Sequence, residues 1–299
     1  MTTIAENFDT TPHKRTRFRF RFSLKFFLIY LMLGLYCFFT IFAFIWVISV
    51  SLKTNQEFLV SPPWSFPAVP QFENYVTAWN RGFSTMFINS TIVSVLGAVF
   101  SVGIATMAAY VIARIPFKLN RAMLTFFLLG MMVPYMLTSI PLYYLVTRIQ
   151  RELFTIDSRI ILIILYTVSG FPFNTFVMVS VFKTLPTEME EAAMMDGASA
   201  LRTFFRVMLP LSRPGLATCF IINFLSLWNE FYWAMIFTKG KANYTISLGI
   251  VMLDQQAVYT AKWVDLFAGA VINVLPVLIV FALLQDQVTK GMTAGAVKG

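Results

Sequence analysis

Six long apolar segments dominate the chain, each bounded by polar or proline-containing residues. They run approximately over Phe26–Val50, Met86–Ala113, Ala122–Val146, Ile160–Phe182, Gly215–Phe237 and Leu266–Gln285. Each is long enough to cross a bilayer as a helix, which takes roughly 20 apolar residues. Pro134 and Pro141 interrupt the third segment, and Asn273 and Pro276 interrupt the sixth. Membrane helices tolerate such breaks where neighbouring groups satisfy the freed backbone. The pattern therefore predicts an all-α membrane protein with six transmembrane helices.

Polar stretches flank and separate these segments. A basic tail covers residues 1–25 and a second tail covers 286–299, so the transmembrane domain is predicted to span 26–285. Four prolines make the connection 51–84 read as irregular structure. The connection 238–265 is long and polar, with little helical periodicity, and it is predicted to be a loop.

Composition supports the membrane class, and the positive charges indicate an orientation. Hydrophobic residues make up 58% of the 299 and charged residues only 12%, whereas soluble domains carry about 25% charged residues. The net charge of +9 would suggest nucleic acid in a soluble protein. Here the Lys and Arg residues lie between apolar runs, fifteen on the side of the N-terminus and eight on the other. Cytoplasmic loops attract Lys and Arg, so both termini are expected in the cytoplasm, with no nucleic-acid partner.

The first apolar segment resembles a secretory signal only superficially. It is about 25 residues long, whereas the apolar region of a signal peptide is roughly 7–15 residues. No small-residue cleavage pattern follows it. We expect it to remain as the first transmembrane helix.

The residues that catalysis or metal binding would need are missing from the sequence. The one histidine, His13, lies in the polar tail, which argues against a histidine metal centre or a Ser/His/Asp triad. Cys37 and Cys219 lie inside apolar segments and are expected to act as small apolar fillers. A phosphate-binding G-x-x-x-x-G-K-[ST] loop is absent, since Gly240-Lys241 is followed by Ala242. The sequence predicts no catalytic residue, no metal site and no cofactor bound by this chain, which would not be an enzyme by itself.

The polar stretch after the fourth segment predicts two short helices. Pro186 suits a first helical turn, which also carries Glu188, Glu190 and Glu191, where negative charge complements the helix dipole. Gly197 can end this helix. The second helix would start at Ser199, carry apolar and basic rows, and break at two prolines. The apolar row is Leu201, Phe204, Phe205 and Met208, the basic row is Arg202 and Arg206, and the two prolines are Pro210 and Pro214.

The exposed apolar residues of this stretch need a surface to cover them. Close approach of another protein, which the small alanines permit, is one interpretation. The other is that the stretch rests on lipid headgroups as an amphipathic segment. The physics of the residues alone supports both equally.

The same stretch carries a motif. Glu191-Ala192-Ala193-x-x-Asp196-Gly197-Ala198, then Phe204, then Leu209-Pro210-x-x-x-Pro214 resembles the EAA loop of binding-protein-dependent ABC importer permeases. The resemblance implies the type I ABC importer permease fold, with a cytoplasmic coupling helix between spans 4 and 5 that seats in an ATP-hydrolysing subunit. The docking residues would be Glu191, Ala192, Ala193, Met194, Met195, Asp196, Gly197, Ala198, Arg202, Phe204 and Arg206.

Other stretches resemble the carbohydrate-uptake branch of that family. Trp228-Asn229-Glu230-Phe231 resembles a segment common in its permeases, and 291–299 resembles the tail of the maltose-type second permease subunit. Ser51-Leu52-Lys53, Asn74-Tyr75 and Asn89-Ser90 also look like this branch, with Phe182-Lys183 as a departure. The similarity runs from Phe26 onward, with a family-type core over about 86–285.

This resemblance implies a set of partners and a location. The partners would be a second homologous permease, two ATP-binding subunits that hold ATP and Mg, and an extracytoplasmic solute-binding protein. The substrate would be a sugar or oligosaccharide, and the location a bacterial inner membrane. The tail residues expected to reach between the ATP-binding subunits are Gly295, Ala296, Val297, Lys298 and Gly299. The rival hypotheses are a secondary transporter or channel working without ATP, and a membrane scaffold or assembly factor.

Polar and aromatic residues inside the apolar segments are candidates for the solute path. A charge at the bilayer centre costs about 2.5–3.5 kcal/mol, so Glu230 should face the protein interior or a cavity. It would either contact solute or anchor helices, and its place near a span end favours the anchor, as it does for Asn273. The solute-path candidates are Trp228, Asn229, Glu230, Tyr135 and Tyr232, with Tyr143, Tyr144 and Tyr166 as further aromatics. Positions facing lipid or the interface remain the default for aromatic residues.

Overall fold

The structure is a computed structural model that describes residues 24–260 and 262–296, with side chains described over 24–253 and 262–285. Most of the predicted basic tail 1–25 therefore lies outside the described residues. The chain divides into two compact units, one up to Trp46 and one from Val47 onward. The first unit consists of most of α1 (Leu24–Ser51). No charged side chain lies between Lys25 and Lys53, which is why this helix can cross a bilayer.

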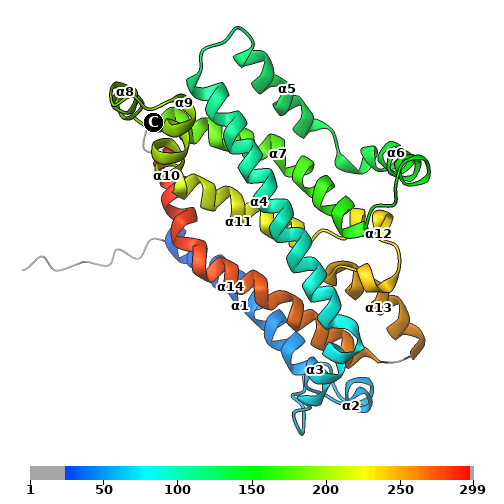
Figure 1. The fold of residues 1–299 in the computed structure, drawn as a ribbon. Coiled ribbons are helices and arrows are strands. Elements are labelled where there is room, and N and C mark those ends of the chain that lie inside the picture. The colour runs from blue at the N-terminus through cyan, green and yellow to red at the C-terminus, as the bar shows by residue number, and fades with distance from the viewer. Residues whose placement is uncertain (1–23, 261, 297–299) are drawn as a thin grey trace, which may run out of the picture. The chain divides into compact units, whose positions relative to one another are not determined.

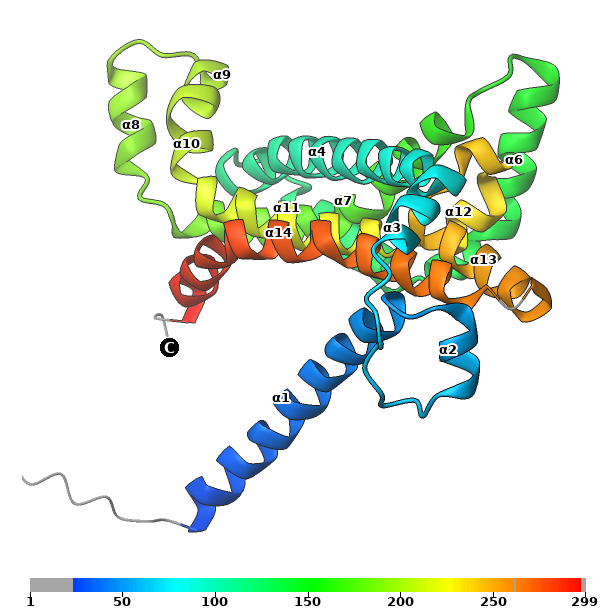
Figure 2. The same ribbon diagram turned by 90° about the horizontal axis from the view of Figure 1, so that it is seen from below.

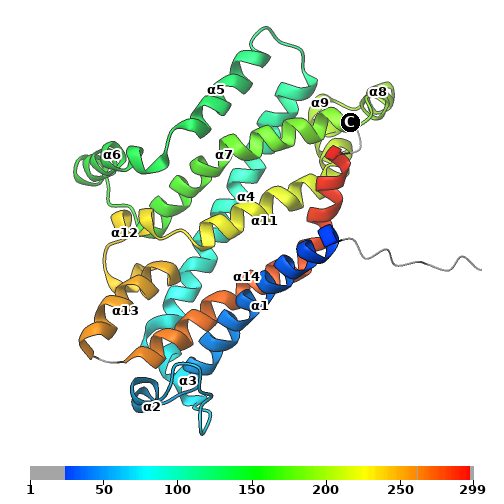
Figure 3. The same cartoon turned by 180° about the vertical axis from the view of Figure 1, so that it is seen from behind.

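The described part of the second unit contains helices joined by turns and loops, and no strand. Its elements are α2 (Asn55–Val60), α3 (Glu73–Ala78), η1 (Trp79–Phe83), α4 (Ser84–Arg114), α5 (Asn120–Met132), η2 (Tyr135–Thr138), α6 (Ser139–Glu152), α7 (Ser158–Thr184), α8 (Glu188–Met195), α9 (Ala200–Thr203), η3 (Phe204–Met208), α10 (Leu209–Leu211), α11 (Arg213–Trp228), α12 (Tyr232–Phe237), η4 (Lys241–Asn243), α13 (Ile246–Thr260) and α14 (Trp263–Ala296). Helices α4, α5, α7, α11 and α14 run side by side (Figures 1 and 3), with α4 packed along α7 and α11 between α4 and α14. Helices α8 to α10 lie at one end of this bundle and α6, α12 and α13 at the other (Figure 2).

The structure supports four of the predicted spans as single long helices and allows up to six. The predicted fifth segment, Gly215–Phe237, is divided between α11 and α12. Four helices are long and apolar enough to cross a membrane by themselves, namely Leu24–Ser51, Glu73–Arg114, Ser158–Thr184 and Trp263–Gln285. Two bent helix pairs bring the number to six if each pair is one span. The first pair joins Asn120–Met132 to Tyr135–Glu152 at 88°, and the second joins Ala200–Leu211 to Arg213–Trp228 at 74°.

The third predicted span, Ala122–Val146, is broken at the interruption that Pro134 marks in the sequence. Helix α5 ends at Met132, Val133 is extended, and the chain then turns by 88°. Pro134 explains the break, because a proline lacks the backbone N–H and disfavours helical geometry at the residue before it.

Both long connections contain more helix than the sequence predicted. The connection 51–84 holds α2, α3 and η1, so the second span begins at Glu73 rather than at Met86. The connection 238–265 holds α13 rather than a loop. The sequence prediction treated 238–265 as uniformly polar, but its stretch 246–253 is largely apolar, and Ile246 and Leu248 there are buried against the bundle.

The α4–α7 contact is close because small residues line it. A Cβ atom added at Gly97 would lie 2.8 Å from the Cβ of Tyr166 and 3.2 Å from a methyl carbon of Leu227. Asn174 of α7 donates a hydrogen bond to the hydroxyl of Ser101 of α4 at 3.0 Å. Small residues and interhelical hydrogen bonds are what hold helices together in lipid, where water does not drive association.

Gly97→Val is therefore expected to destabilise the chain by about 1–3 kcal/mol, the usual cost of overpacking. The purified chain in detergent should show a lower temperature of thermal unfolding. Gly103→Val, in the same helix, is the matched control, because no atom lies within 4 Å of a Cβ added there. Equal unfolding temperatures for the two variants would contradict the close α4–α7 contact.

Candidate functional site

Helix α8 ends where the sequence predicts, but it begins at Glu188, so Pro186 lies before the helix rather than in its first turn. Its first turn holds the three glutamates, and its last residue is Met195. Gly197 follows with a φ of +78°. The backbone N–H of Ala198 donates to the carbonyl of Ala193 at 3.0 Å, and that of Gly197 to the carbonyl of Met194 at 3.0 Å. This pair of bonds satisfies the last helical carbonyls, and the left-handed residue between them favours glycine.

The second helix also starts where the sequence predicts. The hydroxyl of Ser199 accepts a hydrogen bond from the backbone N–H of Arg202 at 3.4 Å. The helix then runs through a π turn, Phe204–Met208, and continues past Pro210 to Leu211. The chain bends at Ser212, between the two prolines that were expected to break it. We refer to residues 185–212 as the α8–α10 segment.

The predicted docking residues do not all share one face. Phe204 and Met208 are buried; the ring of Phe204 packs at 5.0 Å from that of Tyr110. Leu201 and Phe205 are exposed, so the predicted apolar stripe is divided between an inner and an outer face. The exposed docking candidates are Glu191, Ala192, Met194, Met195, Asp196, Gly197, Arg202 and Arg206, and the half-buried ones are Ala193 and Ala198.

The end of α8 is the most open part of this surface. The exposed fraction of Met195 is 89% and that of Met194 is 54%. Figure 2 shows α8 and α10 extending away from the bundle at this end. Flexible, polarizable methionines in such a position suit contact with another protein. The geometry can hold a partner through apolar contact beside a carboxylate, Glu191, and two guanidinium groups.

Sequence reasoning missed the role of Glu190. Its carboxylate is buried, and its Oε2 lies 3.4 Å from Nε of Arg114 at the end of α4. Arg114 also donates to the carbonyl of Leu185 at 2.5 Å. The sequence suggests only a dipole role for Glu190, because nothing in the local pattern connects it to an arginine in a distant segment.

A second polar group lies where α11 gives way to α12, within the predicted fifth span. Oε1 of Glu230 accepts a hydrogen bond from the N–H of Trp233 at 2.7 Å, and Oε2 accepts from Ala234 at 3.2 Å. The hydroxyl of Tyr166 donates to Oε2 at 2.7 Å. Glu230 therefore caps α12 and ties it to α7, which is the anchor role that the sequence favours.

Trp228 and Asn273 form a second anchor beside the first. The indole N–H of Trp228 is 2.9 Å from Oδ1 of Asn273 and 3.0 Å from its carbonyl, which joins α11 to α14. Trp228 is buried. The side chain of Asn229 donates to the carbonyl of Leu225 at 2.8 Å within α11.

Of the candidate aromatics, Tyr135 and Tyr232 lie together. Their ring centroids are 6.1 Å apart in an edge-on arrangement, and Tyr135 also contacts Trp233 at 5.6 Å. The hydroxyl of Tyr232 lies 3.1 Å from that of Ser139. Tyr135, Tyr143 and Tyr144 are exposed, whereas Tyr166 is fully buried. The exposed rings near the α11–α12 break are therefore Tyr135 and, in part, Tyr232.

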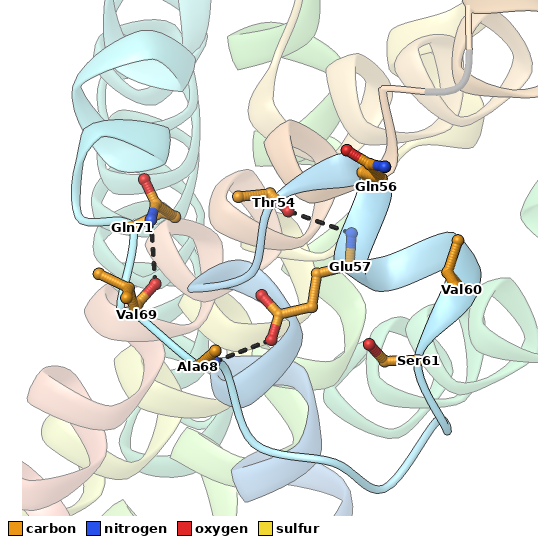
Figure 4. Close-up of a pocket in the computed structure, with 8 residues that line it drawn as sticks. All are labelled: Thr54, Gln56, Glu57, Val60, Ser61, Ala68, Val69 and Gln71. Atoms are coloured by element: carbon orange, nitrogen blue, oxygen red, sulfur yellow. Dashed lines mark hydrogen bonds between the residues drawn. The ribbon is translucent and has the colours of Figure 1, made fainter.

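A hollow lies beside α2, at the end of the bundle away from α8 (Figure 4). It is lined by Thr54, Gln56, Glu57, Val60, Ser61, Ala68, Val69 and Gln71. Glu57 accepts from the N–H of Ala68 at 2.8 Å, and Thr54 accepts from the N–H of Glu57 at 3.1 Å. These hydrogen bonds engage the side chains of Glu57 and Thr54 in stabilising the conformation of the loop around the hollow. Among the described residues, no cluster of three or more His, Cys, Asp or Glu could hold a metal ion.

The predicted tail contact falls largely outside the described residues. Helix α14 continues to Ala296, so the backbone at Gly295 and Ala296 is helical, but their side chains are not described. Val297, Lys298 and Gly299 lie outside the described residues.

Comparison with known proteins identifies the family. Residues 101–294 match the family described as "Binding-protein-dependent transport system inner membrane component". The chain is 35% identical to the diacetylchitobiose uptake system permease protein NgcG of Streptomyces coelicolor, over 84% of this chain and 82% of that protein. It is 33% identical to the trehalose/maltose transport system permease protein MalG of Thermococcus litoralis, over 87% and 92%.

The fold is also similar to a solved structure. A chain from a bacterial ABC transporter involved in the import of the acidic polysaccharide alginate superposes with a TM-score of 0.72 at 23% identity, covering 87% of this chain and 95% of that one. Sequence and fold agree, and the multi-pass helical architecture is the one expected of such a subunit. The chain therefore belongs to the family of binding-protein-dependent transport system inner membrane components, the permeases of ABC importers.

Proposed function

We propose that this chain is the non-catalytic translocation subunit of an ATP-driven importer for a sugar or oligosaccharide. The relatives are named for uptake of diacetylchitobiose and of trehalose or maltose, which supports a carbohydrate substrate. ATP and Mg would be bound by two partner subunits, because the sequence lacks a phosphate-binding loop. A second homologous permease would complete the transmembrane pore, and an extracytoplasmic binding protein would deliver the solute.

The observation that carries the proposal is the uncovered end of α8. Met194 and Met195 project into solvent beside Gly197, at the residues that resemble the EAA motif. We propose that this surface seats in an ATP-binding subunit. Helix α14 ends at Ala296 at the same end of the bundle (Figures 1 and 2), which would bring the tail residues 295–299 toward the same partners.

We infer from the excess of Lys and Arg that the α8 end faces the cytoplasm. Helices α8 to α10 lie at one end of the bundle and α6 at the other (Figure 2). Arg202 and Arg206 belong to α9 and η3, Arg114 and Lys183 to the last turns of α4 and α7 before this segment, and Arg148 and Arg151 to α6. In the sequence, fifteen Lys and Arg residues fall in the segments predicted to face the cytoplasm and eight in the segments predicted to face outward. A bacterial inner membrane with both termini in the cytoplasm accommodates this distribution.

As an energetic account, ATP closes the two ATP-binding subunits onto each other and draws the docked helices together. The transmembrane helices then reorient so that the central solute path opens to the outside, and ATP hydrolysis returns them to the inward-facing state. A ligand shifts such an equilibrium only through its differential affinity for the two states, and ATP supplies most of that difference.

The proposal is tested in proteoliposomes that contain the permease with its partner subunits. Uptake of a labelled sugar should require both ATP inside and the binding protein outside, and should fall to the level of empty liposomes when either is omitted. Binding calorimetry of the purified binding protein against maltose, trehalose, diacetylchitobiose and longer oligosaccharides selects the sugar. Uptake that persists without ATP would favour the rival, a secondary transporter or channel.

A further inference from the structure

Helix α8 is attached to the bundle through one buried side chain. Of its eight residues, which are all described, Glu190 is the one that is buried. The residues on either side, Met189 and Glu191, are exposed. A carboxylate is unfavourable in such a place unless it has a positive partner. The partner is Arg114, whose side chain is only 9% exposed.

Arg114 holds two parts of the chain at once. It is the last residue of α4. Its guanidinium donates to the carbonyl of Leu185, which ends α7, and lies 3.4 Å from the Glu190 carboxylate of α8. The phenol of Tyr110, one turn earlier on α4, also lies near Glu190. The planar guanidinium holds its N–H groups in fixed, separate directions and so spans two acceptors, whereas a lysine gathers its donors on one compact ammonium group.

The distance between Arg114 and Glu190 is longer than a hydrogen bond and can shorten. At 3.4 Å, it exceeds the roughly 2.7–2.9 Å of a charge-assisted hydrogen bond. Within the described part of the chain, Oε1 of Glu190 and Nε of Arg114 have no hydrogen-bond partner. A small displacement of α8 toward α4 would allow the carboxylate and the guanidinium to form the missing bonds.

We propose that the Arg114–Glu190 ion pair, which we call the joint, couples a displacement of α8 to a displacement of α4. Helix α4 then carries the movement along its length to the far end of the bundle, since it is packed along α7. Both are positioning residues: neither touches solute or nucleotide. The inference rests on the proposed docking of an ATP-binding subunit on α8.

The test uses the whole complex with Cys37→Ser and Cys219→Ser, and with Asn229→Cys at the exposed break between α11 and α12. The rate of maleimide labelling is measured with and without MgATP and vanadate, which needs no knowledge of the sugar. The parent complex should show a rate that depends on the nucleotide. Arg114→Gln and Glu190→Gln should reduce that dependence about tenfold, while the ATP-binding subunit still co-purifies because the exposed face of α8 is unchanged.

Two further variants keep the proposal testable if a neutral substitution prevents folding. Arg114→Lys retains the buried charge but not both bonds, and should also reduce the nucleotide dependence. The exchange of Arg114→Glu with Glu190→Arg should restore part of it. The matched control is the exposed pair Arg148 and Glu152 on α6, where Arg148→Gln and Glu152→Gln should change nothing.

The outcomes separate the joint from the function on which it rests. A parent complex whose labelling is indifferent to nucleotide would contradict both the ATP-driven function and the joint. A parent that responds, with single variants within about twofold of it, would overturn the joint alone. The joint is also overturned if nucleotide dependence falls only in proportion to lost ATP-binding subunit, since the pair would then merely hold α8 in its fold.

Discussion

Replacing Gly197 by arginine is expected to release the ATP-binding subunits from the membrane complex and to abolish transport. The backbone at Gly197 has a φ of +78°, a conformation that costs a residue with a side chain about 1–2 kcal/mol. Among the described residues, apart from its two chain neighbours, no atom lies within 4 Å of a Cβ added there. A large side chain would thus meet little in the permease itself and would project into whatever covers α8. The measurements are co-purification of the ATP-binding subunits and ATP-dependent uptake.

Gly197→Ala is the matched control for this prediction. It carries the same backbone strain but adds a single methyl group, so it should retain most of the bound subunit. The difference between the two variants isolates the volume of the side chain at the interface. Assembly and transport of Gly197→Arg at the native level would show that no partner covers this turn.

Glu230→Ala is expected to have the second-largest effect, a loss of about 2–4 kcal/mol of stability. The substitution removes the acceptor for two backbone N–H groups at the start of α12, and a lost helix cap costs about 0.5–2 kcal/mol. It also leaves the hydroxyl of the fully buried Tyr166 without its acceptor, which costs about 1–3 kcal/mol. Thermal unfolding of the purified chain should occur at a clearly lower temperature.

The anchor and solute roles of Glu230 can be separated. Tyr166→Phe removes one of the same hydrogen bonds, so its effect and that of Glu230→Ala should be non-additive in the double variant. Glu152→Ala, at an exposed pair on α6, should leave the unfolding temperature unchanged. An anchor lowers the unfolding temperature and the maximal uptake rate without changing KM. A raised KM with an unchanged unfolding temperature would instead assign Glu230 to the solute.

Much of the fold follows from the apolar pattern because lipid imposes it. A segment of about 20 apolar residues has few alternatives to a spanning helix, which is why all six segments correspond to helical regions. The apolar pattern does not predict in which direction the helices bend. Pro134 was visible, but its 88° turn depends on what α6 packs against. Helix α13 was missed although its apolar start packs on the core through Ile246 and Leu248, because the polar residues around that start hid it in the sequence.

The two parts of the candidate site differ in the same way. The end of α8 and the start of α9 follow from local chemistry, since Gly197 and Ser199 satisfy backbone groups within a few residues of themselves. The residues that predict these helix ends therefore lie next to them in the sequence. The burial of Glu190 depends on Arg114, which only the tertiary structure brings near. Phe204 was assigned to the docking surface but packs inward on Tyr110, because the helix carries apolar residues on both faces.

The most direct test of the account is a site-specific cross-link from the tip of α8. Met195 is 89% exposed, so Met195→Cys in a cysteine-free chain should fold normally. In the assembled complex it should cross-link to a cysteine-bearing ATP-binding subunit, and in intact cells it should resist a membrane-impermeant thiol reagent. Labelling of that cysteine from outside the cell, or an assembled and active complex in which it reaches no ATP-binding subunit, would contradict the docking of α8.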